Sequence, residues 1–350
     1  MEKYVQTLTN AAVSEDAIKC GKCFMCGGPA STGQGEHVFP LWLQHKYGLL
    51  NQKLTLLNGT LIPYRRLTSP CCEPCNTGPL ADLERRVKVQ AESYETNFEN
   101  DDLRLLVGLW LFKILFGIIH AECRFSYDQS DPSLGSIFPP KFADELHSLH
   151  LLVNSHRKPT VFRCLHGAVP FTVYLYRIAE SRHYDLFDFS TNLFGKSVAI
   201  RMGKLGAIAV ADGGLQIEAG KLGPFGLDGQ ELHPLQFDEL VSRVHYKSVL
   251  RDATHFYLNS ETKKSLLIEQ VRVTYYSNVL LEDGSQQTFR DWDERELGNM
   301  LSLYTRLNIP WFDEIHRQTY TYTFLADGSR NMNFAELDEK LDKIWGIPSA

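Results

Sequence analysis

The sequence predicts an α+β protein in which a small cysteine-rich module is followed by a larger mixed α/β body. Six of the eight cysteines fall between residues 20 and 75. From Pro79 to about residue 119, apolar residues recur at the three- and four-residue spacing of helices. From about 149 to 217, short runs rich in β-branched and aromatic residues indicate strands. These three patterns predict a module over 1–90, a helical segment over 91–148 and an α+β domain over 149–350.

Length and composition agree with several folded modules. The chain has 350 residues, and roughly 150 residues per domain is the usual prior. Hydrophobic residues make up 43% and charged residues 22%, which is ordinary globular usage and argues against wholesale disorder. The N-terminus lacks the pattern of a signal peptide, and Lys113 interrupts the most apolar run, Leu105 to Ile119. We therefore expect a cytoplasmic protein without a membrane partner.

Charge is unevenly distributed along the chain. Residues 1–90 carry ten Lys/Arg and seven Asp/Glu, a net of +3, whereas the other 26 Lys/Arg and 35 Asp/Glu give −9. A mildly basic head joined to an acidic body fits a phosphate-binding module on a body that does not bind nucleic acid.

Several local signals place elements in the body. The apolar run beginning near Asp102 predicts a helix, and FDELVSRVHYKSVL predicts another over 237–250. Further helices are expected over 292–307, with Asp291 and Glu294 at capping-box spacing, and over 334–345 behind Asn333 with Glu336. Hairpins are expected at the Asp-Gly turn of residues 283–284 and over 320–334.

The cysteines of the first module have the spacing of a structural zinc site. Each C-x2-C turn presents two sulfurs to one face of a tetrahedral ion, and the chosen ligands are Cys23, Cys26, Cys72 and Cys75. Cys20 and Cys71 are adjacent alternatives that could exchange with them. Disulfides are the rival interpretation, but they are uncommon in cytosolic proteins. The expected cofactor is therefore Zn²⁺ in a structural role.

Between the two cysteine pairs lies GEHVFPLWL, and the second pair ends in Cys75-Asn76 ahead of a helix. The whole pattern over residues 20–90 resembles the zinc-knuckle HNH, or ββα-metal, endonucleases. The resemblance implies a two-stranded hairpin and a helix that hold one catalytic Mg²⁺ or Mn²⁺, distinct from the zinc. It implies that Glu36 and Asn76 are ligands of that ion and that His37 is the general base that activates water against a DNA phosphodiester.

The sequence departs from the family pattern at the middle asparagine. IPYRRLTSP, where that residue is expected, contains no asparagine, and Asn58 upstream is the nearest candidate. Arg65 and Arg66 are candidates for contacting substrate phosphates from the predicted second strand, although at most one of two neighbouring strand residues faces the site. Plainer alternatives stand beside these roles: Glu36 as a turn cap, His37 as a zinc ligand and Asn76 as a helix cap.

Two functions therefore follow from the sequence. The first is a metal-dependent endonuclease acting on DNA, in the defence or mobile-element setting where such domains commonly occur. The second is a catalytically inactive zinc-binding adaptor for nucleic acid or protein. Residues 91–350 contain no Walker A, dinucleotide fingerprint or nucleophile elbow. An acidic, mixed α/β body joined to a nuclease head would suit binding of a protein partner, self-association or control of cleavage.

Overall fold

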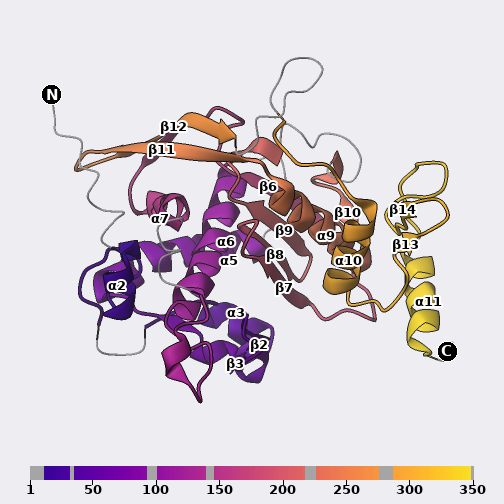
Figure 1. The fold of residues 1–350 in the computed structure, drawn as a ribbon, viewed down its shortest axis with the longest axis horizontal. Helices are drawn as coiled ribbons and strands as arrows, with labels where there is room; N and C mark the ends of the chain where they lie inside the picture. Colours follow the sequence, from indigo (N-terminus) through magenta and orange to yellow (C-terminus); the bar gives the residue numbers. More distant parts are fainter. Residues whose placement is uncertain are drawn as a thin grey trace. The chain divides into compact units, whose positions relative to one another are not determined.

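The fold was analysed in a computed structural model (Figure 1). It describes residues 12–31, 35–92, 101–138, 146–216, 226–275 and 287–347. For residues 254, 256 and 271–275 it describes the backbone alone. The chain divides into two compact units. The first comprises Met1–Glu92, Leu105–Leu165 and Phe256–Arg272, and the second Ser93–Arg104, His166–His255 and Val273–Ala350.

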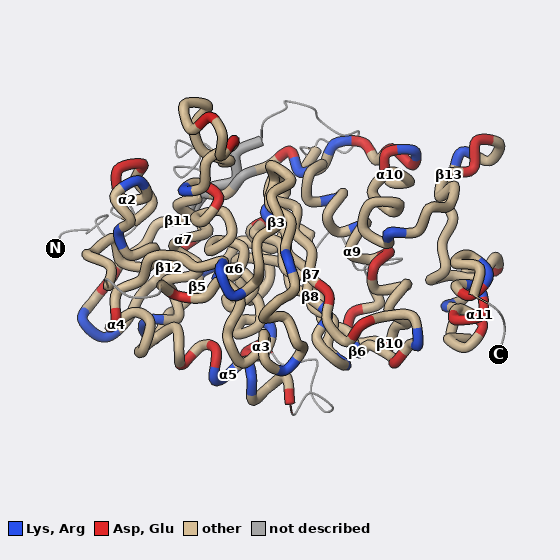
Figure 2. The backbone as a smooth tube through the Cα atoms, turned by 90° about the horizontal axis from the view of Figure 1, so that it is seen from below, with Lys and Arg blue, Asp and Glu red and all other residues tan. Residues whose placement is uncertain are grey.

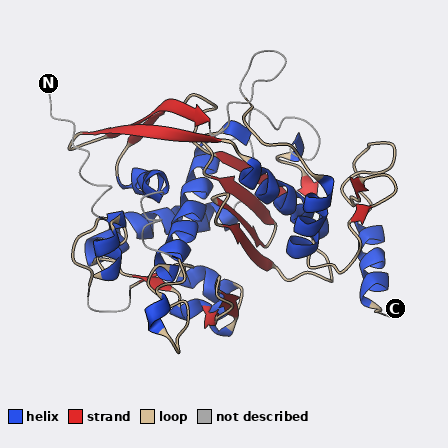
Figure 3. Ribbon diagram, viewed as in Figure 1, coloured by secondary structure: helices blue, strands red, loops and turns tan. Residues whose placement is uncertain are grey.

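The first unit joins the cysteine-rich module to most of the predicted helical segment. Its helices and strands are short before α5 and α6, as Figure 3 shows. In chain order they are α2 (Glu15–Lys19), β1 (Glu36–His37), α3 (Leu41–Lys46), η1 (Leu49–Asn51), β2 (Lys53–Thr55), β3 (Leu61–Pro63), η2 (Tyr64–Arg66), β4 (Thr68–Ser69), α4 (Glu73–Cys75), η3 (Asn76–Leu80), α5 (Ala81–Glu92), α6 (Asp101–Glu122), η4 (Pro132–Leu134), α7 (His147–Asn154), η6 (Ser155–Arg157) and β5 (Thr160–Arg163).

Helix α6 forms the centre of the core in this unit. Trp110, Phe112, Lys113 and Phe116 are at most 1% exposed, as expected of a helix that is apolar nearly all round. The helix begins where the sequence predicted, and at 22 residues it is long and apolar enough to cross a membrane by length and composition alone. However, 89% of its most apolar window is buried within the protein. This is the environment of a core helix.

A three-stranded sheet lies mostly in the first unit, which includes residues 256–272. Its order is β11–β12–β5, where β11 is Ala253–Glu261 and β12 is Leu266–Tyr275. β12 runs parallel to β5, with Leu266 opposite Thr160. Leu151 of α7 packs against Leu266 and Ile268 in a small apolar cluster. Sequence-distant strands therefore contribute to the same unit as the cysteines.

The second unit is built on a five-stranded sheet of order β10–β6–β9–β8–β7. Only β10 and β6 pair in parallel; the other neighbours are antiparallel. Helix α9 (Pro234–Leu250) covers the sheet, with Phe237, Leu240 and Val244 packed on Tyr176 and Ile208. The strands are β6 (Thr172–Ile178), β7 (Phe187–Asn192), β8 (Ser197–Met202), β9 (Leu205–Val210) and β10 (Glu231–Leu232).

The C-terminal elements form a second apolar cluster in the same unit. Leu297 and Leu301 of α10 (Glu294–Thr305) pack with Trp311 and with Leu341 of α11 (Phe334–Trp345). The expected cap of α11 is confirmed, because the Asn333 side chain accepts from the Glu336 amide. The small strands β13 (Phe312–Asp313) and β14 (Gln318–Thr319) pair antiparallel.

The helix cap predicted at Asp291 is wrong by two residues. Asp293 caps α10, and its carboxylate accepts from the amides of Arg295 and Glu296. The hairpin expected over 320–334 is present around the bridge between Phe324 and Arg330. The predicted Asp-Gly turn at residues 283–284 lies outside the described residues.

Figure 2 shows acidic and basic positions interspersed along α5 and α11. The predicted α+β class is confirmed, with a four-cysteine group near the N-terminus and several small sheets.

Candidate metal centre and histidine site

The structure brings together the four cysteines that the spacing selected. The Sγ atoms of Cys23, Cys26, Cys72 and Cys75 all lie within 4.8 Å of one another. The first pair sits on a tight turn in which the Gly27 amide donates to the Cys23 carbonyl at 2.8 Å, and Gly27 has a φ of 71° that favours glycine. In the second pair the Cys75 amide donates to the Cys72 carbonyl at 3.1 Å. The first knuckle (Cys23–Cys26) and the second knuckle (Cys72–Cys75) thus converge on one point, although Cys26 and Cys72 are 46 positions apart in the chain.

These four sulfurs fit a structural zinc ion. A Zn–S bond of about 2.3 Å in a tetrahedron requires sulfurs about 3.8 Å apart, and Cys26 Sγ lies 3.7 Å from Cys72 Sγ. Burial raises the pKa of the Cys26 and Cys75 thiols, so clustered thiolates need a cation to compensate their charge. The group can therefore hold a structural metal such as zinc, and four thiolates leave no open position for catalysis.

The two neighbouring cysteines lie outside this group. Cys20 is exposed, whereas Cys71 is buried with its Sγ 3.9 Å from Cys23 Sγ. The Cys71 carbonyl accepts from the Ser31 amide at 3.1 Å, so this residue ties the two knuckles together through its backbone.

A short pair of antiparallel strands links the two knuckles. In β1 and β4, Glu36 lies opposite Ser69 and His37 opposite Thr68. Gly35 precedes this pair because a Cβ there would lie 2.2 Å from the Ser69 carbonyl oxygen. The order is knuckle, strand, strand, knuckle and helix, although the connection between the strands contains α3, η1, β2, β3 and η2 rather than a tight turn.

Glu36 belongs to a buried ion cluster that the sequence did not reveal. Its Oε1 lies 2.6 Å from the Lys113 Nζ, and Glu84 Oε1 lies 2.9 Å from the same ammonium. Lys113 also donates to the carbonyls of His37 at 2.7 Å and Val38 at 3.3 Å. Burial opposes the charge of Lys113, but the two carboxylates outweigh it and raise its pKa. The ammonium of α6 therefore fixes β1 to α5.

The second carboxylate of this cluster is held near its titration point. Burial raises the pKa of Glu84 to about 7, with Lys113 opposing the shift. When both carboxylates are ionised, the cluster of Glu36, Glu84 and Lys113 has a net charge of −1. The signal available in the sequence was Lys113 itself, because a lone charge in an apolar helix must find a partner when buried.

His37 is a half-buried, neutral imidazole. Its Nδ1 is buried and has no hydrogen-bond partner among the described residues. Burial lowers the pKa of His37 below its ordinary value of 6.5, while Glu36 opposes and Lys113 adds to the shift. A neutral ring at pH 7 can accept a proton. It is not a member of the four-sulfur group, so the alternative of His37 as a zinc ligand finds no support there.

Asn76 directly follows Cys75, the last cysteine of the second knuckle. Its amide donates to the Cys72 carbonyl at 3.0 Å, and it starts the single π turn η3 that leads into α5. It is the C-cap residue of α4, and its side chain makes no hydrogen bond among the described residues. The partly exposed amide is available to a ligand.

Asn58 has a structural role in the described part of the chain. Its Nδ2 donates to the Tyr127 carbonyl at 2.8 Å, and its Oδ1 accepts from the Thr60 amide at 3.0 Å. These bonds hold the turn between β2 and β3 to the segment after α6. Both polar atoms of the Asn58 side chain are engaged in these bonds, and the residue does not belong to the strand pair that contains His37.

The expectation that the two arginines lie on a strand is wrong. Tyr64–Arg66 form the 3₁₀ turn η2, because Pro63 has no N–H to continue the pairing of β3 and the buried Tyr64 ring packs edge-on against Phe39 at 4.8 Å. Arg65 donates to the Asn51 side chain at 2.9 Å, and both arginines are exposed.

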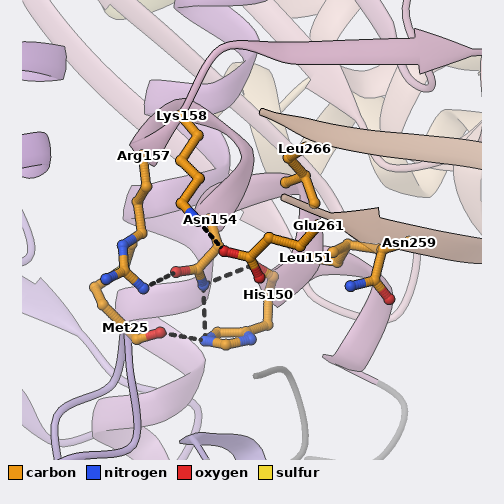
Figure 4. A pocket seen from close by; sticks show the side chains of 9 residues that line it. All are labelled: Met25, His150, Leu151, Asn154, Arg157, Lys158, Asn259, Glu261 and Leu266. Carbon is orange, nitrogen blue, oxygen red and sulfur yellow. Dashed lines mark hydrogen bonds and ion pairs between the residues drawn. The ribbon is translucent and has the colours of Figure 1, made fainter. Parts of the chain in front are cut away.

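A pocket adjoins the first knuckle (Figure 4). The Met25 carbonyl lies 3.0 Å from His150 Nε2, and Asn154 and Arg157 extend the same face, as the labelled side chains show. Burial lowers the pKa of His150 to about 4, so this imidazole is neutral. Its contact with Met25 packs α7 against the cysteine turn and supports it.

Comparisons with known proteins give no independent assignment. No protein-family model matches the chain, and neither the curated proteins nor the solved structures contain a match. The functional interpretation therefore depends on the motif and on the geometry of the site.

Proposed function

We propose that this chain is an HNH-type endonuclease that hydrolyses phosphodiester bonds in DNA. The observation that carries the proposal is the order and pairing of the elements: β1 with Glu36 and His37 lies against β4, and the cysteine turn that follows β4 runs directly into Asn76. A four-sulfur site that closes it gives the short strands a rigid frame.

His37 has the properties of a general base in this proposal. Burial favours its neutral form. Its buried Nδ1 has no hydrogen-bond partner among the described residues, so the ring can still accept a proton or bind a ligand. Asn76 supplies an amide oxygen and Glu36 a carboxylate, the oxygen donors that Mg²⁺ or Mn²⁺ prefers. When bound, such an ion neutralises charge on the phosphoryl oxygens. Glu84 adds a second carboxylate beside the Lys113 ammonium.

One observation favours the second candidate, a zinc-held adaptor without catalysis. Glu36 is 7% exposed and already paired with Lys113, so a divalent ion must share that carboxylate with an ammonium. In the adaptor, Glu36 anchors β1 to α6 and the module binds nucleic acid or a protein partner without cleaving it.

Cleavage of supercoiled plasmid separates these two functions. We expect nicking or linearisation with Mg²⁺ or Mn²⁺, suppression by EDTA under conditions that leave the zinc in place, and loss of at least about 100-fold in His37→Ala, which is the usual scale for removing an acid–base group. His45→Ala is the matched control, because His45 is an exposed histidine on α3.

The outcome distinguishes the candidates clearly. Wild-type cleavage that persists unchanged in His37→Ala, or no cleavage with either metal and any plasmid form, would overturn the nuclease. DNA binding that survives in His37→Ala without cleavage in the wild type would establish the adaptor.

A further inference from the structure

A second polar pocket in the first unit is lined by two arginines. It has a volume of about 400 Å³ and lies among β3, η2 and the segment that follows α6. Arg66 comes from η2 and Arg124 from the segment that follows α6, 58 positions apart in the chain. Thr60 and Gln129 add polar groups, and Ile62 and Phe125 add apolar surface.

The charge of this pocket is uncompensated. The residues that line it include no Asp or Glu. Neither Arg66 nor Arg124 makes an ion pair with any residue in the described ranges. Arg124 is exposed, and partial desolvation of its guanidinium lowers its pKa. In contrast, neighbouring Arg65 donates to Asn51 at 2.9 Å, and buried Lys113 has two carboxylates.

The wall of the pocket is held in place by hydrogen bonds. Asn58 Nδ2 donates to the carbonyls of Ser126 at 3.4 Å and Tyr127 at 2.8 Å. Glu122, at the end of α6, accepts from the Leu57 amide at 3.1 Å through Oε1. These bonds fix the β2–β3 turn to the segment that follows α6. The backbone segments that carry the two arginines are therefore already held together, which lowers the entropy lost when the arginines are ordered around a ligand.

We propose that this pocket binds a phosphate group together with part of its attached nucleoside. Guanidinium groups recognise phosphate through charge-assisted, often bidentate hydrogen bonds. A volume of about 400 Å³ accommodates more than a bare ion, and Ile62 and Phe125 offer apolar surface to a sugar or base. The assignment of a nucleotide rests on the proposed nuclease, in which the pocket would hold substrate away from His37. The preference for an anion rests on the arginines alone.

Binding can be measured without cleavage by using the full chain with zinc in place and no added divalent ion. The probes are inorganic phosphate, thymidine 5′-monophosphate and a single-stranded thymidine oligonucleotide, with uncharged thymidine for comparison. We expect saturable binding of a phosphate-bearing probe and none of thymidine. Arg66→Gln and Arg124→Gln should each weaken binding on the order of tenfold or more, as expected for a charge-assisted contact. Affinity should also fall with added salt.

Arg86→Gln is the matched control, because it removes an exposed arginine of α5 that does not line the pocket. It should change the affinity less than twofold. Binding of the monophosphate as well as the oligonucleotide assigns a free nucleotide site, whereas binding of the oligonucleotide alone assigns the nucleic-acid backbone. Absence of binding to every phosphate probe, or equal losses in Arg86→Gln and Arg124→Gln, would overturn the proposal.

The two proposals fail in different ways. Unchanged cleavage in His37→Ala rejects the nuclease while the binding assay still reports on the arginines. Zinc content and thermal midpoint of each variant, equal to those of the wild type, show that a lost affinity is not a lost fold.

Discussion

Replacement of Lys113 by methionine tests the buried cluster that fixes β1. Each of its two ion pairs, at 2.6 and 2.9 Å, has a gross attraction of about 6 kcal/mol at an effective dielectric constant of about 20. Desolvation of the three charges offsets much of this attraction. Removal of the ammonium nevertheless leaves Glu36 and Glu84 without their cation, and loss of one member of a buried pair costs about 3–5 kcal/mol.

The loss should depend on pH in a defined direction. Burial already raises the pKa of Glu84 to about 7, and removal of Lys113 raises it further. A carboxyl whose folded pKa is raised stabilises the fold below its unfolded pKa, and this contribution is lost as the pH rises through the folded pKa. Lys113→Met should therefore lose about 3–5 kcal/mol at pH 8 and distinctly less at pH 6.

Urea unfolding followed by tryptophan fluorescence at both pH values measures this effect. Lys88→Met on the exposed face of α5 is the matched control and should change the free energy of unfolding by less than about 0.5 kcal/mol. Addition of Glu84→Gln to Lys113→Met should recover part of the loss, because it removes one unpaired carboxylate. A loss below about 1 kcal/mol at pH 8, or one that is equal at the two pH values, would refute the reasoning.

Three further outcomes follow from local geometry. Gly35→Ala should destabilise the first unit by at least about 1 kcal/mol, because its Cβ would meet the Ser69 carbonyl at 2.2 Å, whereas Gly78→Ala, with open space, should be neutral in the same thermal melts. Burial lowers the pKa of His150 to about 4. As the pH drops from about 6.5 to about 4, the imidazole is protonated in the unfolded state but not in the folded state, so the free energy of unfolding falls. This residue contributes up to about 3 kcal/mol of that loss. In His150→Gln the unfolding free energy should vary less over that range, and a curve parallel to that of the wild type would contradict the assignment. For cleavage, burial of His37 places the acidic limb of kcat/KM below pH 6.5, and a limb above 6.5 in the rate profile would exclude it as the base.

The cysteine group was predictable because its information is local. Each C-x2-C turn supplies a pair of sulfurs, and a tetrahedral zinc ion requires four ligands, so the two pairs are expected to bind the same ion. The cap at Asn333 was predictable for the same reason, since it depends on a residue three positions away. The pairing of β1 with β4 also followed, because the resemblance implied a two-stranded hairpin between the two cysteine turns.

Features that depend on long-range contacts were not predictable from these patterns. Lys113 meets Glu36 and Glu84 from 77 and 29 positions away, and periodicity records only that α6 is apolar around it. The assignment of a strand to Tyr64–Arg66 failed because Pro63 ends the pairing and Tyr64 turns inward onto Phe39. Arg124 was overlooked because its partner in the second polar pocket, Arg66, becomes a neighbour only in the folded chain.

Zinc content tests the central claim most directly, since the frame around His37 depends on the four-sulfur site. Metal analysis of the purified chain should find about one zinc per molecule. A variant with both Cys23→Ser and Cys72→Ser should contain less than about a tenth of that amount, whereas Cys20→Ser, which changes an exposed cysteine outside the group, should retain all of it. A wild-type chain free of zinc with normally titrating thiols, or full zinc in the double variant, would contradict the account.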